Sequence, residues 1–134
     1  MKVFTVNGQD YRLPSSPNAF QKELYVHLIN WKWERITKDP GMDGGLEYDA
    51  ILPESCADQF LMLYPDIVES LKNHLELFPF RIHPYFNHMA SSQAANINLF
   101  LPVLLHDRAN DMLRAIRPDF ERLARDQLDS GYRI

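Results

Sequence analysis

The chain has 134 residues, of which 46% are hydrophobic and 24% are charged, with a formal net charge of -4 and an isoelectric point near 5.7. This length and composition are typical of one globular domain and exclude a fibrous or disordered chain. The negative charge excludes a small basic protein that coats nucleic acid through its overall field. The single cysteine, Cys56, excludes an internal disulfide framework and a zinc site of several thiolates, and it suits a reducing cytoplasm.

The chain shows neither a secretion signal nor a membrane-spanning segment. Its first residues alternate and then turn polar, without the apolar core of a signal peptide. The longest apolar run, residues 97–105, is interrupted by Asn98 and Pro102 and is too short to cross a bilayer. We therefore expect a soluble, cytoplasmic protein with no membrane partner.

The first predicted element is a β-hairpin. Residues 3–6 alternate up to Asn7-Gly8, a pair that favours positive φ, and the pattern resumes at residues 11–13. Ser16 is then predicted as the N-cap, followed by a proline at the first position, of a helix that runs to about Thr37.

Two ridges of large side chains predict that this helix is buried over a wide face. The first ridge consists of Phe20, Leu24, His27, Leu28 and Trp31, and the second of Tyr25, Ile29, Trp33 and Ile36. The two tryptophans could also form a base-stacking platform, but aromatic residues at helical spacing usually belong to the core, and we predict them there.

Residues 38–48 contain one proline and three glycines and are expected to form a connecting loop, because they fit neither a phosphate-binding nor a dinucleotide-binding pattern. A short helix is predicted around residues 55–63. A longer one follows Tyr64-Pro65 and ends at Pro79; its predicted apolar side consists of Ile67, Leu71, Leu75 and Phe78. The stretch 79–85 is expected to be extended or turning.

The remaining elements are a helix that starts near Met89 and two helical pieces from Arg108 to about Leu128, divided near Pro118. Gly131 is predicted to cap the last helix, and residues 132–134 to begin a strand. The predicted fold class is therefore mainly α (α+β): a short N-terminal β-hairpin, about five or six helices, and the start of a strand.

The chain carries no complete catalytic set. Metal-dependent nucleases of the common kind need an Asp/Glu-x-Lys triplet, in which carboxylates hold magnesium and the lysine orients water. Two positions before Lys22, Lys32, Lys38 and Lys72 stand Phe20, Asn30, Ile36 and Ser70, so the triplet is absent. Cys56 lacks a nucleophile motif, and His83 and His88 do not have the i, i+4 spacing of a zinc pair, so we expect no metal site.

The helix that starts near Met89 has an unusual composition. Its predicted apolar stripe includes small residues and consists of Ala90, Ala94, Ile97, Leu101 and Leu104. Ser92, Gln93 and Asn96 share a neighbouring polar face. Because amides both donate and accept, this face could hold a buried structural network, a backbone segment of a region missing from this chain, or nucleic acid.

Arginines near the C-terminus are candidate phosphate contacts. They are Arg108, Arg114, Arg117, Arg122 and Arg125. Acidic residues are interspersed among them, and mixed charge of this kind is more typical of a solvated helix face.

The segment HMASSQAANINLFLP, residues 88–102, resembles the Met-x-Ser-Ser-Gln-Ala…Asn-Leu-Phe-x-Pro signature of a family of uncharacterised bacterial and archaeal proteins within the PD-(D/E)XK nuclease-like superfamily. LEYDAILPE, residues 46–54, is also similar to that family, and the resemblance extends over about residues 46–105. The signature residues that carry over are Ser91, Ser92, Gln93, Ala94, Asn98, Leu99 and Phe100.

In that family the signature helix precedes a sheet that carries the catalytic Asp and the Glu-x-Lys lysine. The resemblance therefore implies that residues 1–134 form a single helical domain, the N-terminal part of a larger nuclease-like fold, and that Mg²⁺ would bind only once the downstream core is present. It also implies that signature residues support the active centre, with Gln93 steadying a metal-bound water or a catalytic carboxylate. The residues proposed for this support are Ser91, Ser92, Gln93, Asn96 and Asn98.

Two other interpretations stay open. One is a non-enzymatic helical module that binds a protein partner or nucleic acid, DNA being the candidate, and the other is a stand-alone hydrolase that uses Cys56 or His83. An apolar face left by a missing core could also lead to a homodimer.

Overall fold

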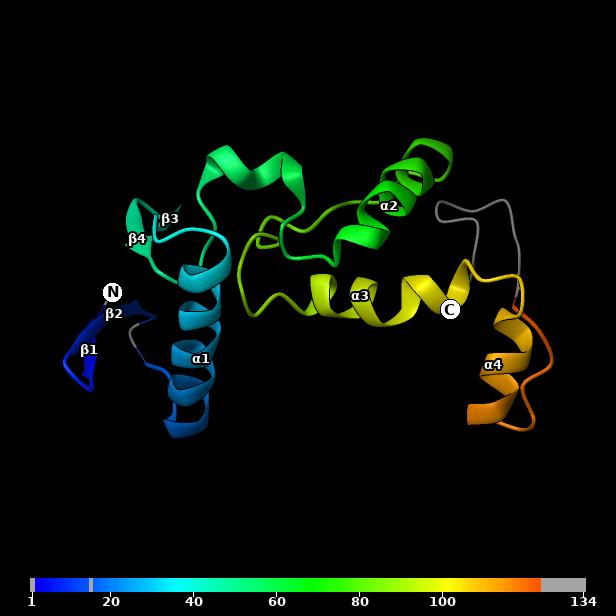
Figure 1. The fold of residues 1–134 in the computed structure, drawn as a ribbon, viewed down its shortest axis with the longest axis horizontal. Coiled ribbons are helices and arrows are strands. Elements are labelled where there is room, and N and C mark those ends of the chain that lie inside the picture. The colour runs from blue at the N-terminus through cyan, green and yellow to red at the C-terminus, as the bar shows by residue number, and fades with distance from the viewer. Residues whose placement is uncertain (1, 15, 124–134) are drawn as a thin grey trace. The chain divides into compact units, whose positions relative to one another are not determined.

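The computed structural model describes residues 2–14 and 16–123. This part of the chain contains two hairpins and five helices (Figure 1). In chain order they are β1 (Lys2–Val6), β2 (Gln9–Leu13), α1 (Ala19–Arg35), β3 (Gly41–Asp43), β4 (Leu46–Tyr48), the 3-10 helix η1 (Glu54–Gln59), α2 (Pro65–Leu77), α3 (Ser92–Leu104) and α4 (Ala109–Ile116). The predicted α+β class, with a hairpin ahead of several helices, is confirmed at this level.

The chain divides into two compact units. The first comprises Met1–Met62 and Pro84–Ser92, and the second comprises Leu63–His83 and Gln93–Ile134. Two compact units are compatible with one domain or with two, so the single-domain prediction stays a prediction.

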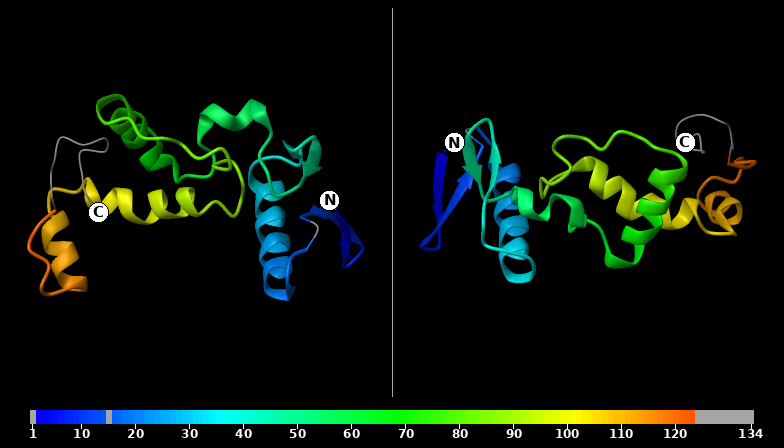
Figure 2. Two further views of the ribbon diagram at one scale, coloured as in Figure 1. Left: turned by 180° about the vertical axis from the view of Figure 1, so that it is seen from behind. Right: turned by 90° about the horizontal axis from the view of Figure 1, so that it is seen from above.

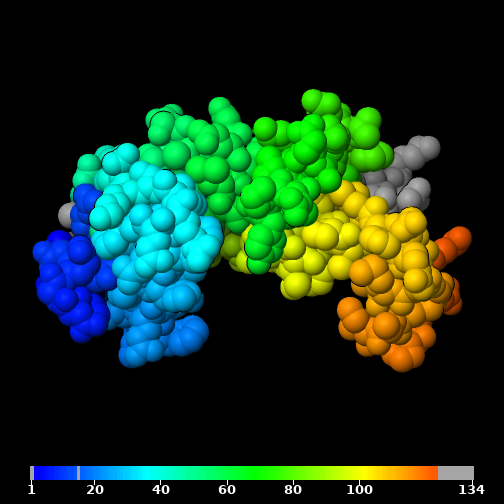
Figure 3. Space-filling view, viewed as in Figure 1, coloured from blue at the N-terminus to red at the C-terminus, as the bar shows by residue number. Residues whose placement is uncertain are grey.

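The N-terminal hairpin has the predicted position and turn. β1 and β2 pair antiparallel, with Val6 opposite Gln9 at the end nearest the turn. The two turn residues, Asn7 and Gly8, have φ values of 50° and 79°. Positive φ at both positions is the type I′ geometry that suits the right-handed twist of the strands. Figure 3 shows this hairpin in dark blue beside α1, whose colour runs from blue to light blue.

Helix α1 begins two residues later than predicted. The N-cap is Asn18, not Ser16, because Asn18 and Gln21 form a capping box. The Asn18 side chain accepts a hydrogen bond from the Gln21 backbone at 2.8 Å, and the Gln21 side chain accepts one from the Asn18 backbone at 3.0 Å. This arrangement satisfies two backbone donors at once, whereas a serine cap would satisfy one.

Only one of the two predicted ridges of α1 is buried. Ile29, on the second ridge, is fully buried, and Trp33 stacks on Tyr11 with 5.2 Å between the ring centroids. The prediction was wrong for the first ridge, since Phe20 is 72% exposed and Trp31 is 39% exposed. The hairpin packs against one side of α1, which leaves the first ridge mostly exposed, although Leu28 of that ridge still packs against the core.

The segment 38–48 is not a plain loop, as predicted, but contains the hairpin β3–β4. Gly44 and Gly45 form its turn with φ values of 56° and 79°. Gly41 is buried at the start of β3, where its Cα faces Ile51 and Leu52. These glycines therefore supply a hairpin turn and a close backbone approach, and not flexibility.

The core of unit 1 gathers residues from segments far apart in the sequence. Its buried apolar members are Tyr11, Leu13, Ile29, Ala50, Leu52 and Met89. They come from β2, α1, the stretch after β4 and the start of the signature segment, so the signature is anchored in this core.

Unit 2 contains α2, α3 and α4, and the start of α2 lies beside α3 (Figures 1 and 2). On α2 the predicted apolar side is buried at Ile67 and Leu71, but Phe78 is the C-cap and is 37% exposed. After α4 the helical prediction was wrong for residues 119–123, which are not helical. The rest of that predicted piece, the Gly131 cap and the strand at residues 132–134 lie outside the described residues.

The predicted short helix at residues 55–63 is a 3-10 helix, Glu54–Gln59, in unit 1. It ends because Phe60 adopts the left-handed conformation, with φ of 51°. The Phe60 ring contacts Phe86 edge to face, with 5.7 Å between the centroids. Packing of this aromatic pair therefore accompanies the early end of the helix.

We expect Gly41→Ala to lower the free energy of unfolding by about 1–3 kcal/mol, the usual cost of overpacking. A Cβ at this position would lie 2.5 Å from the Leu52 carbonyl oxygen and would also overlap the Ile51 side chain. Urea unfolding measures the change, and Met42→Ala, at a site 60% exposed on the same strand, is the control. Equal stability of the two variants would show that β3 does not pack against residues 51 and 52 in this way.

Candidate functional site

The two stretches that carry the family resemblance lie side by side in unit 1. The Leu52 amide donates to the Asn87 carbonyl at 2.9 Å, and the Met89 amide donates to the Ala50 carbonyl at 2.7 Å. Ile51 and His88 form an antiparallel bridge between these two bonds. The first part of the signature, ahead of α3, therefore pairs with residues 50–52 through an isolated β-bridge.

His88 is enclosed by this pairing. Its ring meets Tyr25 edge to face, with 5.6 Å between the centroids, and its Nδ1 accepts a hydrogen bond from the Ala90 amide at 3.2 Å. Burial lowers the pKa of His88, and the carboxylate of Asp43 opposes this shift. An acceptor Nδ1 and a lowered pKa both correspond to a neutral imidazole near pH 7.

The amide of Gln93 holds a backbone segment of the same chain in unit 2. Its Oε1 accepts a hydrogen bond from the His83 amide at 2.8 Å, and its Nε2 donates to the Arg81 carbonyl at 3.1 Å. One side chain thus satisfies a donor and an acceptor two residues apart, as a neighbouring strand would. Of the alternatives left open by the sequence, the structure shows this amide in a structural network within the chain itself.

Asn98 makes a similar contact one and a half turns further along α3. Its Oδ1 accepts a hydrogen bond from the Tyr64 amide at 2.9 Å, at the N-cap of α2. Ser91, Ser92 and Asn96 also take part in contacts, so none of the five proposed support residues is free. Whether they support a catalytic centre stays a prediction.

The outward side of α3 carries large apolar side chains of the signature itself. Leu99 is 65% exposed and Phe100 is 43% exposed, whereas Ala94 is buried at 1%. An exposed leucine alone needs no explanation, but Leu99 and Phe100 are adjacent and together give α3 an exposed apolar surface.

The candidate phosphate contacts on and after α4 are engaged with acidic groups. Arg114 contacts the Asp111 carboxylate at 3.0 Å and donates to the Glu121 carbonyl at 2.7 Å. Arg117 contacts Asp119 at 2.8 Å. Arg122 is exposed, and Arg125 lies outside the described residues. These exposed pairs are weak individually, but they lower the local positive potential that phosphate would need.

A charged cluster in unit 1 was not predicted from the sequence. Asp49 is 2% exposed, and its carboxylate accepts from the Arg12 guanidinium at 2.6 Å and 3.0 Å and from the Arg12 amide at 2.6 Å. Arg12 also pairs with Glu47. The hydrogen bond to Asp49 is the main cause that raises the pKa of Arg12.

Lys32 completes this cluster from α1. It is fully buried, and its Nζ donates to the carbonyls of Asp39 at 2.6 Å and Asp49 at 2.9 Å. Burial lowers the pKa of Lys32, while the Asp49 carboxylate opposes the shift. Because Nζ is enclosed by carbonyl oxygens, this lysine holds backbone together and is not placed to attack a substrate.

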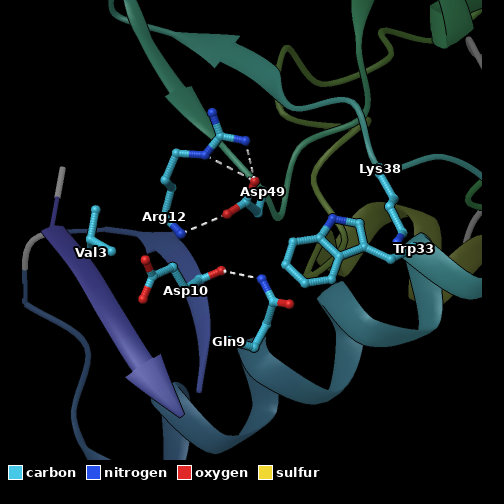
Figure 4. Close-up of a pocket in the computed structure, with 7 residues that line it drawn as sticks. All are labelled: Val3, Gln9, Asp10, Arg12, Trp33, Lys38 and Asp49. Carbon is cyan, nitrogen blue, oxygen red and sulfur yellow. Dashed lines mark hydrogen bonds and ion pairs between the residues drawn. The ribbon is translucent and has the colours of Figure 1, made fainter. Parts of the chain in front are cut away.

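A pocket of about 370 Å³ lies beside the cluster (Figure 4). Its lining residues are Val3, Gln9, Asp10, Arg12, Trp33, Lys38 and Asp49. Figure 4 shows the Arg12 and Asp49 side chains turned toward each other, so each of these two charged groups is already paired with the other. The sequence signal was Asp49 within the resemblance stretch 46–54, but its partner Arg12 lies 37 positions away.

Among residues 2–14 and 16–123, no group of three or more His, Cys, Asp or Glu side chains could hold a metal ion. Cys56 is half-buried, with its sulfur 4.0 Å from the Ser55 hydroxyl. None of the helices in the described part is both long and apolar enough to span a membrane.

Comparisons of the chain with protein-family models, with curated proteins and with solved structures found no match.

We expect the free energy of unfolding to fall as the pH is lowered through and below about 6.5 because of His88. The folded-state pKa of His88 lies below that of the unfolded chain, so the unfolded chain takes up a proton first. The fall should level off below the folded-state pKa, and His88→Asn should reduce it. An NMR titration of the His88 ring is expected to give a midpoint below 6.5, and a midpoint at or above that value would contradict its burial.

Gln93→Ala should expose the backbone of residues 81–83. Losing a hydrogen bond costs about 0.5–1.5 kcal/mol, so the His83 amide is expected to exchange with deuterium severalfold faster. Gln93→Glu keeps an acceptor for His83 but loses the donor to Arg81, and should therefore protect the His83 amide better than alanine does. Gln59→Ala, which removes an exposed bond in unit 1, is the control. Unchanged exchange of the His83 amide in Gln93→Ala would show that the Gln93 side chain does not hold residues 81–83.

Proposed function

We propose that this chain supplies the helical, non-catalytic portion of a PD-(D/E)XK nuclease-like protein. The catalytic Asp and the Glu-x-Lys triplet, together with the Mg²⁺ that they would bind, belong to a sheet outside these 134 residues. The proposal rests first on the resemblance of residues 46–105 to that family. It assigns the chain to the cytoplasm and DNA to the assembled protein as its substrate.

The observation that carries the proposal is that the polar and the apolar side chains of the signature have different surroundings. Its amides, Gln93 and Asn98, bind backbone of this chain, while Leu99 and Phe100 are exposed. The exposed part of the signature therefore includes two large apolar side chains, although Ser92 and Asn96 are exposed as well. A sheet face is an apolar surface that a helix commonly covers, so the exposed pair suits docking of the catalytic sheet.

The residues assigned to active-centre support then act indirectly. Gln93 fixes residues 81–83 and Asn98 fixes the start of α2, and in this way both hold α3 in the orientation that presents Phe100. A direct hydrogen bond from Gln93 to a metal-bound water would require its amide to leave this backbone. We therefore propose positioning, and not contact with substrate, as the role of Gln93.

The alternative is a non-enzymatic helical module. Here the exposed apolar pair on α3 favours a protein partner, which could be a second copy, over nucleic acid. Arg114 and Arg117 are already engaged with acidic residues of the same chain. A DNA complex of the module alone would have to break these pairs before the guanidinium groups could bind phosphate.

The proposal is tested by sequencing the gene beyond the codon for Ile134 and expressing its whole reading frame. We expect an Asp and a Glu-x-Lys triplet in a strand pattern, and Mg²⁺-dependent cleavage of DNA by the whole product. Leu99→Asp and Phe100→Asp should lower the cleavage rate by about 10- to 100-fold, because burial of such a side chain contributes about 1.5–3 kcal/mol to docking.

Leu77→Asp is the matched control, since Leu77 is 73% exposed in the same unit but lies outside the signature. It should leave cleavage unchanged. A reading frame that stops at Ile134, or a whole product that lacks the triplet and does not cleave DNA, would contradict the nuclease proposal and leave the binding module.

A further inference from the structure

The outer edge of β1 has backbone groups that can accept another strand. The two-residue turn makes Val6 and Gln9 a hydrogen-bonded pair, and hydrogen-bonded pairs alternate along an antiparallel ladder. Phe4 therefore bonds to β2, whereas the N–H and C=O groups of Val3 and Thr5 point away from it.

The same alternation applies to β2, where the outward groups are covered. The Arg12 amide donates to the Asp49 carboxylate and the Arg12 carbonyl accepts from the Asp49 amide at 3.2 Å. On β1, by contrast, no described residue outside the hairpin is hydrogen-bonded to the backbone of Val3 or Thr5. In Figures 1 and 2 the outer side of β1 faces away from the rest of unit 1.

An apolar pocket of about 300 Å³ lies next to this edge, between β1 and α1. Its lining residues are Val6, Lys22, Glu23, Val26 and His27. Val6 and Phe4 belong to the face of β1 that packs toward the core. A strand added beside β1 would present every second side chain to this same face, so one of these side chains could enter the pocket.

The charge beside the pocket is positive on the side of Phe4. The Nζ atom of Lys22 lies 4.4 Å from the centre of the Phe4 ring. Within the described part of the chain, Lys22 makes no salt bridge. Lys2 stands two positions before Phe4, on the same face of β1. A carboxylate of the added strand that stands opposite Phe4 would therefore lie near a lysine ammonium group.

We propose that the outer edge of β1 binds an extended segment of a partner protein as a third, antiparallel strand. The segment places an aliphatic side chain in the pocket beside Val6. Because the added strand runs opposite to β1, the residue two positions later stands opposite Phe4, and this residue is acidic. Backbone hydrogen bonds at Val3 and Thr5 hold the segment, and the aliphatic-x-acidic pattern selects it.

The charge preference is tested with two acetylated and amidated peptides, Thr-Thr-Val-Thr-Asp-Thr-Thr and the same peptide with lysine in place of aspartate. Binding is followed by the NMR shifts of the Val3 and Thr5 amides during titration of the full chain. We expect the aspartate peptide to bind at least fivefold more tightly, and Lys22→Glu to reverse the order. Equal binding of the two peptides, or an order that Lys22→Glu leaves unchanged, would overturn the proposal.

The strand addition itself is tested at Val3, which is 56% exposed. Val3→Pro removes an outward N–H and none of the hairpin bonds, a place where edge strands tolerate proline. Val3→Thr keeps the N–H and is the matched control. Binding of the aspartate peptide should fall at least tenfold in Val3→Pro and stay within twofold in Val3→Thr.

Two further outcomes decide the occupant. If Val3→Pro does not fold, as judged by its NMR spectrum, the reversal by Lys22→Glu decides the question. If sedimentation shows that the chain alone forms a dimer that Val3→Pro abolishes, and neither peptide binds, the edge pairs with a second copy and the proposal of a partner segment is wrong.

Discussion

The buried carboxylate of Asp49 is the interaction on which unit 1 depends. It binds the backbone amide and the guanidinium of Arg12, and the backbone carbonyl of Asp49 accepts from Lys32. A single residue thus connects β2, the end of β4 and α1. Because Asp49 directly precedes Ala50, it also sets the position of the segment with which the signature pairs. The Asp49 contacts therefore help to hold the segment on which the signature pairs.

Such a cluster is stable only when every member is satisfied. A buried carboxylate without its partners, or a buried ammonium without acceptors, costs several kcal/mol, whereas the complete set is close to neutral in stability. Lys32 meets this condition through two carbonyl oxygens, and Asp49 through three hydrogen bonds from Arg12. The cluster therefore favours the arrangement in which β2, the end of β4 and α1 bring all of these groups together.

The sequence predicted elements that depend on neighbouring residues. The turn at Asn7-Gly8 and the apolar side of α2 at Ile67 and Leu71 follow from turn chemistry and helical period, and both are present. The strands β3 and β4 were missed because three residues are too few to show an alternating pattern. Here the Gly44-Gly45 pair was a usable signal for a hairpin turn.

Features that depend on distant residues could not be predicted. Which ridge of α1 is buried depends on where β2 packs, and Phe20 and Ile29 are equally good core residues by type. The Arg12–Asp49 contact joins positions 37 apart. In the candidate site, the odd polarity around Gln93 was visible in the sequence, but its partner was not, because a backbone segment can present the same donors and acceptors whatever its side chains are.

The backbone of residues 79–83 explains why amides are present in the signature at all. Residues 79–83 form neither a helix nor a strand and include a proline, so they have no helix or sheet of their own to satisfy their backbone groups. The Gln93 side chain donates to the Arg81 carbonyl and accepts from the His83 amide. Neither a carboxylate nor an ammonium group can do both. The amide is therefore required by the folding of this chain before any ligand is considered. The large apolar side chains that the signature leaves exposed are Leu99 and Phe100, beside the exposed polar residues Ser92 and Asn96.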